Sequence, residues 1–82
     1  MRQQRKGNIL EVDLHGMTAD EAKRSLERLL SSAPPAVKEV VVIHGYYNGT
    51  VLQEMVRTKL KHPRIASKML SLNPGATRLI LK

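Results

Sequence analysis

Two short stretches of one design decide the fold: Val12-Asp13-Leu14-His15-Gly16 and Val41-Val42-Ile43-His44-Gly45. In and before the first stretch, apolar residues alternate with polar ones, a pattern that predicts a β-strand. The second stretch lies in a run of β-branched residues from about 38 to 44, typical of a strand in the middle of a sheet. Each predicted strand therefore ends in a histidine followed by a glycine.

A helix is predicted after each of these strands. Thr18 and Glu21 have the spacing of a capping box, and the apolar stripe behind them is typical of an amphipathic helix that stops before Pro34. Thr50 and Gln53 repeat the spacing ahead of a second stripe. The stripes consist of Ala22, Leu26, Leu29 and Leu30 in the first helix and of Leu52, Met55, Val56 and Leu60 in the second.

Two further strands are predicted at Lys68–Leu72 and Thr77–Leu81, around the turn sequence Asn73-Pro74-Gly75. The element order is β-α-β-α-β-β. Right-handed crossovers make the first two strands parallel and put both helices on one face, while the last two strands form an antiparallel hairpin. We therefore expect an α/β fold, a two-layer sandwich with a mixed four-stranded sheet, over residues 8–82. Residues 1–7 are expected to form a disordered basic tail.

Length and composition exclude several classes of protein. Eighty-two residues make one small domain, and the absence of cysteine excludes disulfides, a thiol nucleophile and a Cys-ligated zinc site. The longest aliphatic run, Val40–Ile43, is far too short to cross a bilayer. Nothing near the N-terminus has the pattern of a signal peptide. We expect a cytoplasmic protein that makes no membrane contact.

The charge is unevenly distributed along the chain. Fourteen Lys and Arg against seven Asp and Glu give a net charge of +7, and all the acids lie between Glu11 and Glu54. Residues 55–82 therefore carry the whole excess. Such an imbalance favours nucleic acid as a partner, although a basic helix face that contacts only water is the alternative. The expected contacts to the nucleic-acid backbone are Arg57, Lys59, Lys61, Arg64 and Lys68.

The candidate catalytic residues are Asp13, His15 and His44. Asp13 and His15 are two apart on a strand, so a carboxylate could orient the imidazole. The carboxyl ends of parallel strands border the ligand site of open α/β sheets, so we expect His15 and His44 to converge there. Two imidazoles suffice as general base and general acid for RNA cleavage. The same side chains could ligate a divalent metal, which we do not favour because three ligands are few for a closed site.

The loops after the two strands add candidate binding residues. Helix N-termini that follow glycine-bounded turns direct N–H groups at a phosphate, and a tyrosine ring in such a loop can stack on an unpaired base. The blander alternatives are that His-Gly only shapes a turn and that one ring packs under its loop. His62 is expected to cap the second helix. The predicted binding residues of these loops are Gly16, Gly45, Gly49, Tyr46 and Tyr47.

These motifs resemble a known family. The stretch from Val12 to Thr18 looks like the Asp-Leu-His-Gly motif of the small MutS-related (Smr) domain, and Ile43-His44-Gly45 with Gly49 resembles its second motif, His-Gly-x-Gly-x-Gly. Residues 75–81 resemble its closing strand. The resemblance covers the chain from about Ile9 to the end. Tyr47 replaces the middle glycine of the second motif.

The resemblance implies a fold like the C-terminal domain of translation initiation factor three. It also implies nucleic-acid binding and, in some members, endonuclease activity: nicking of DNA or cleavage of mRNA linked to stalled ribosomes. The family's chemistry is attributed to the positions of Asp13 and His15, and phosphate positioning to those of His44, Gly45 and Gly49. We expect an Smr-type domain that binds nucleic acid, with weak endonuclease activity, RNA preferred and no cofactor. A non-catalytic adaptor for ribosomes or branched DNA is the alternative, and a protein-interaction domain is a third.

Overall fold

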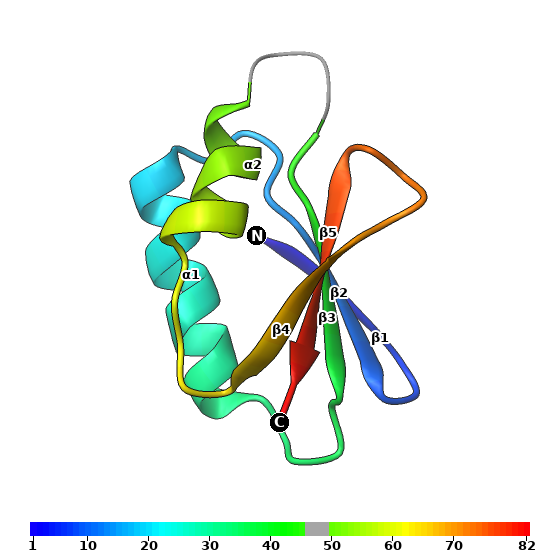
Figure 1. The fold of residues 1–82 in the computed structure, drawn as a ribbon. Coiled ribbons are helices and arrows are strands. Elements are labelled where there is room, and N and C mark those ends of the chain that lie inside the picture. The colour runs from blue at the N-terminus through cyan, green and yellow to red at the C-terminus, as the bar shows by residue number, and fades with distance from the viewer. Residues whose placement is uncertain (46–49) are drawn as a thin grey trace.

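The computed structural model describes residues 1–45 and 50–82. Its elements are β1 (Arg2–Lys6), β2 (Ile9–Asp13), α1 (Ala19–Ser32), β3 (Glu39–Ile43), α2 (Val51–Glu54), the π-helical turn η1 (Met55–Lys59), β4 (Ile65–Leu70) and β5 (Ala76–Leu81). The strands form one mixed sheet in the order β1-β2-β3-β5-β4. Figure 1 shows α1 and α2 on the same side of this sheet.

The predicted α/β class and the strand directions are confirmed. Strands β2 and β3 are parallel, as the crossover through α1 requires, and β4 and β5 form the antiparallel hairpin. Strand β5 also pairs antiparallel with β3, which makes β3 central. The predicted turn is present: the Asn73 side-chain oxygen accepts the Gly75 N–H at 2.9 Å. The hairpin's first strand begins at Ile65, three residues earlier than predicted.

The prediction of four strands was wrong, because the described residues form five. The additional strand, β1, lies in the segment we expected to be a disordered tail. It pairs antiparallel with β2 through a turn at Gly7, whose φ is +62°. All its side chains are exposed, so it shows none of the apolar alternation that reveals a strand in sequence. Its charged side chains also protect the edge of the sheet from further pairing.

Helix α1 follows its sequence signals closely. The Thr18 hydroxyl oxygen accepts the Glu21 N–H at 3.2 Å, so the predicted N-cap is present. Asp20 and Glu21 lie in the first turn, where they balance the positive end of the helix dipole. This N-terminus is therefore already neutralised, and it is a poorer phosphate site than the sequence suggested.

The second helix differs from prediction. Thr50 makes no side-chain cap, so the capping box predicted with Gln53 was wrong. After one α-helical turn the backbone widens into η1, which ends with the Leu60 N–H donating to the Met55 carbonyl at 2.7 Å. The Thr58 hydroxyl bonds the Glu54 carbonyl at 2.7 Å. A hydroxyl that takes the carbonyl four residues earlier competes with the α-helical backbone bond and favours such widening.

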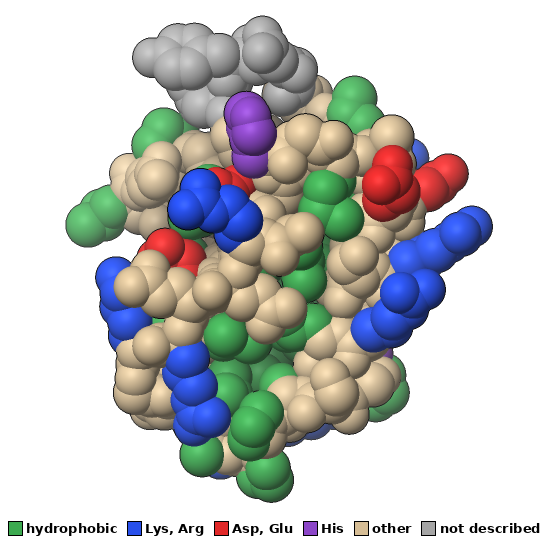
Figure 2. Space-filling view, turned by 180° about the vertical axis from the view of Figure 1, so that it is seen from behind, with side chains coloured by type: hydrophobic (Ala, Val, Ile, Leu, Met, Phe, Trp, Pro, Cys, Tyr) green, Lys and Arg blue, Asp and Glu red, His purple; other side chains and the backbone are tan. Residues whose placement is uncertain are grey.

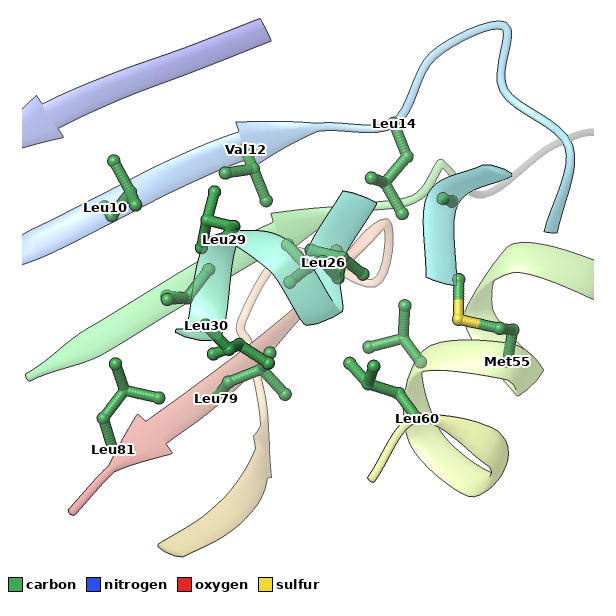
Figure 3. Packing of buried hydrophobic residues seen from close by; sticks show 14 of the residues in the cluster. Leu10, Val12, Leu14, Leu26, Leu29, Leu30, Met55, Leu60, Leu79 and Leu81 are labelled. Carbon is green, nitrogen blue, oxygen red and sulfur yellow. The ribbon is translucent and has the colours of Figure 1, made fainter. Parts of the chain in front are cut away.

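The core lies between the sheet and the helices. Figure 3 shows the leucines of α1 against side chains from β2 and β5, with Met55 and Leu60 completing the cluster from η1 and the turn after it. The predicted stripes are buried apart from Leu52, which packs at the margin. Truncating a leucine here costs about 2–5 kcal/mol. Among the described helices, none combines the length and apolarity needed to cross a membrane.

Candidate nucleic-acid interface

The two His-Gly turns lie next to each other at one end of the sheet. Asp13 pairs with Ile43 in the parallel register, and the Leu14 N–H donates to the Ile43 carbonyl at 2.9 Å. The sequence prediction that neighbouring strands bring the two turns together is therefore confirmed for the backbone. This end is the carboxyl end of both parallel strands, where open α/β sheets bind ligands.

The first turn presents His15 to solvent. The Asp13 carboxylate accepts the backbone N–H of His15 at 2.9 Å, which forms an Asx turn. Gly16 follows with a φ of +80°, a conformation that favours glycine. We expected Asp13 to orient the His15 imidazole, but the bond that the structure shows reaches its backbone. Asp13 therefore holds the shape of the turn, while His15 remains exposed.

The second turn buries its histidine. Only 8% of His44 is exposed, and both of its ring nitrogens have partners. Nε2 lies 2.8 Å from the Thr77 hydroxyl, and Nδ1 lies 3.0 Å from the Gly45 carbonyl. The same hydroxyl accepts the Nε–H of Arg57 at 3.0 Å. Thr77 could not be predicted as a site residue, because a threonine in a strand gives no sign in the sequence of a buried polar partner.

The strand register places the side chains of Asp13 and His44, two of the three predicted catalytic residues, on opposite faces of the sheet. Paired residues point to the same face of a sheet and successive residues to opposite faces, so Asp13 shares a face with Ile43, and His44 points the other way. The burial of Val40, Val42 and His44 puts His44 on the helix-covered face. Asp13 instead lines a hollow of about 410 Å³ on the open face. The structure brings the two turns together, but it does not bring the Asp13 and His44 side chains together.

A third segment packs against the second turn. The Gly75 carbonyl accepts the N–H groups of both His44 and Gly45, at 2.9 and 3.0 Å. A Cβ at Gly75 would lie 3.4 Å from the carbonyl carbon of Gly45, an ordinary van der Waals contact, and 3.3 Å from the Asn73 side-chain oxygen. Gly45 itself has a φ of +87°. The predicted contacts Tyr46, Tyr47 and Gly49 lie outside the described residues.

Two of the five predicted basic contacts are directed into the protein. The Arg64 guanidinium donates to the carbonyls of Ala33, Pro34 and Val37, where it closes the loop after α1. The Lys68 ammonium bonds the carbonyl of Leu60, and burial lowers its pKa, helped by nearby Lys61. Both cations satisfy backbone carbonyls near helix ends. Sequence cannot distinguish such internal cations from exposed ones.

The remaining basic residues of this region are Arg57, Lys59 and Lys61. Lys59 and Lys61 are exposed, and Arg57 is half-buried with its Nε on Thr77. They follow one another along η1 and the turn after it. We call these three residues the η1 cations. Figure 2 shows Lys and Arg side chains on both sides of one face, some of them next to Asp or Glu, with hydrophobic and uncharged surface between the two sides.

His62 does not cap the second helix as predicted. Its Nε2 lies 3.0 Å from the Ser31 hydroxyl, and its Nδ1 accepts the backbone N–H of Arg64 at 3.1 Å. His62 thus joins the chain after η1 to the end of α1. Within residues 1–45 and 50–82, no three His, Asp or Glu side chains lie close enough together to hold a metal ion.

The burial of His44 predicts a pH-dependent stability. Desolvation lowers the pKa of His44 below its ordinary 6.5; Arg57 lowers it further, and the Gly45 carbonyl partly offsets both effects. The unfolded chain therefore binds a proton at this residue more readily than the folded chain. The free energy of unfolding should fall as the pH drops below about 6.5, and urea unfolding should show a lower midpoint at pH 5.5 than at pH 7. His44→Gln should reduce this difference; an unchanged difference in the variant would contradict the assignment.

The fold and the site define a small α/β domain with a His-Gly turn at the carboxyl end of each of two parallel strands. The family model of the Smr domain matches residues 12–77, and the chain belongs to this family. The Smr family is associated with nucleic-acid binding and nuclease activity. Neither the curated proteins nor the solved structures contain a match.

Proposed function

We propose that this chain binds single-stranded RNA at the two His-Gly turns and cleaves it slowly. The observation that carries the proposal is the bond from the Leu14 N–H to the Ile43 carbonyl, which joins an exposed histidine turn to a second glycine turn at one sheet end. Arg57 supplies positive charge beside the second turn through its bond to Thr77, and Lys59 and Lys61 follow it in the chain. Cytoplasmic RNA, with ribosome-bound mRNA as one form, is the proposed substrate.

Binding relies on phosphate contacts. Gly16 and Gly45 have no Cβ, so a phosphate can approach the backbone closely at both turns. The Gly45 N–H already donates to the Gly75 carbonyl, so the phosphate contacts at the second turn come from side chains. The η1 cations would hold neighbouring phosphates, a contribution that weakens as salt rises. Arg64 and Lys68 are left out of the proposal, since their donors bond protein carbonyls.

The proposed chemistry uses one imidazole. His15 takes the proton from a ribose 2′-hydroxyl, the 2′-oxygen attacks the adjacent phosphorus, and the bond from phosphorus to the 5′-oxygen breaks. Water protonates the leaving oxygen, which gives a 2′,3′-cyclic phosphate and a 5′-hydroxyl. His44 has no ring nitrogen available for this exchange, so a single group does the work of two. We therefore expect slow turnover, because no positioned acid protonates the leaving oxygen.

A non-catalytic adaptor, with the ribosome among its partners, is the second candidate. The occupied ring nitrogens of His44 favour it, because they remove one member of the expected acid–base pair. This function predicts salt-sensitive RNA binding without products. The two candidates share the binding surface and differ only in whether the bound strand is cut.

One assay tests both functions. The purified protein is incubated with single-stranded and hairpin RNA oligonucleotides, with Mg²⁺ and with a chelator. Cyclic-phosphate products in both conditions support the proposed chemistry, and products only with Mg²⁺ would replace it with metal-assisted hydrolysis. Binding without products at any metal condition supports the adaptor. No binding at low salt would contradict both.

A further inference from the structure

Four groups beside the second turn form a continuous chain of hydrogen bonds. It runs from Arg57 Nε to the Thr77 hydroxyl at 3.0 Å, on to His44 Nε2 at 2.8 Å, and from His44 Nδ1 to the Gly45 carbonyl at 3.0 Å. Thr77 is almost fully buried, with 1% of its surface exposed. The chain thus joins a basic side chain of η1 to the backbone of the second turn.

The direction of every bond follows from chemistry. A carbonyl only accepts, so His44 Nδ1 carries the proton that Gly45 receives. In the neutral ring Nε2 then has no proton and accepts, so the hydroxyl of Thr77 donates to it. Arginine only donates, and its Nε–H meets the lone pairs of that hydroxyl. All the donors and acceptors are satisfied, and no buried side-chain polar atom of the described residues lacks a partner.

We infer that Thr77 is a positioning residue, which locks His44 as the Nδ1–H tautomer and aims Arg57 at a phosphate bound beside Gly45. The Thr77 hydroxyl donates to His44 Nε2 and accepts the Nε–H of Arg57, so it couples these two side chains. Within the described residues, the one hydrogen bond that the Arg57 side chain donates is from Nε to the Thr77 hydroxyl. Its two terminal nitrogens lie beyond that anchor, where they can form the paired bonds that guanidinium makes with phosphate.

His44 thereby has a different role from the one predicted. The sequence assigned it to proton transfer or to direct phosphate binding, but the hydrogen bonds make it a neutral support for Thr77 and for the Gly45 turn. The phosphate contact passes to Arg57. This phosphate step rests on the proposed function, while the tautomer and the Arg57 anchor do not depend on any ligand.

Thr77→Val tests this series of hydrogen bonds, because valine has the same shape as threonine but no hydroxyl. Long-range ¹H–¹⁵N spectra of the histidine rings should show the Nδ1–H tautomer for His44 in the wild type. In Thr77→Val the unprotonated Nε2 should move downfield as it loses its donor, and the Arg57 Nε–H should exchange faster with water. Thr77→Ser should retain the wild-type values. An Nε2–H tautomer in the wild type, or an Arg57 exchange rate unaffected by valine, would overturn the inference; the wild-type spectrum decides even if the variant unfolds.

Binding of a single-stranded uridine oligonucleotide tests the phosphate step. Thr77→Val and Arg57→Ala should each lower the slope of log affinity against log salt by about 0.7, the contribution of one phosphate contact on a single strand. The double variant should bind no more weakly than Arg57→Ala alone, because both substitutions remove the same phosphate contact. Additive losses would overturn the positioning role. If the wild type binds no RNA, the proposed function and the phosphate step fail together, and the ring spectra still decide the tautomer.

Discussion

Replacing His15 by alanine should slow RNA cleavage by about 10²- to 10⁴-fold, the usual contribution of a positioned acid or base. Because His15 is exposed and its turn is held through the backbone, the variant should keep the fold. The rate of cyclic-phosphate formation under single-turnover conditions measures the effect. RNA affinity should change little, since the loss belongs to the chemical step.

His62→Ala is the matched control, because it removes an imidazole that joins the chain after η1 to the end of α1. This control should cleave at the wild-type rate. Equal rates for His15→Ala and the wild type would exclude the proposed base. Equal losses in both variants would point to destabilisation, which urea unfolding would reveal.

Removing the η1 cations together should weaken RNA binding by about a hundredfold at 0.1 M salt. Three contacts at about 0.7 each lower the salt slope by about 2, and binding curves of different slope converge near 1 M salt. The test uses the triple variant Arg57→Ala, Lys59→Ala, Lys61→Ala. Its RNA affinity, measured over a series of salt concentrations, gives both the salt slope and the loss of affinity.

The control removes the same number of charges from the opposite edge of the sheet. Arg2→Ala, Arg5→Ala, Lys6→Ala changes the net charge identically, and β1 exposes all three side chains. This variant should lose much less affinity than the η1 variant. Equal losses would mean that the overall charge attracts RNA without a defined binding surface.

Most of the fold could be predicted from the sequence, because the local patterns for strands, caps and helices agree with one another. The apolar alternation before His15 and the β-branched run before His44 predict two parallel strands, and the structure has them. The cap at Thr18 and the stripe behind it predict α1. Strand β1 was not predicted from the sequence, because backbone pairing with β2, rather than burial of its side chains, holds it in the sheet.

The site was less predictable, because its chemistry depends on directions that sequence does not specify. Which sheet face His44 occupies depends on register, and a shift of one residue would reverse it. Thr77 becomes important only because the hairpin brings β5 next to β3. Arg64 and Lys68 look like surface cations in the sequence, yet both donate hydrogen bonds to backbone carbonyls of loops and helix ends.

An NMR titration of the ¹⁵N-labelled protein with a short single-stranded RNA tests most directly whether the two His-Gly turns bind phosphate. We expect the largest shifts at Gly16, Gly45 and the Arg57 side chain, with small shifts along β1 and at the end of α1. A footprint centred on β1, or small shifts spread over the whole surface, would contradict a phosphate site built from the two His-Gly turns.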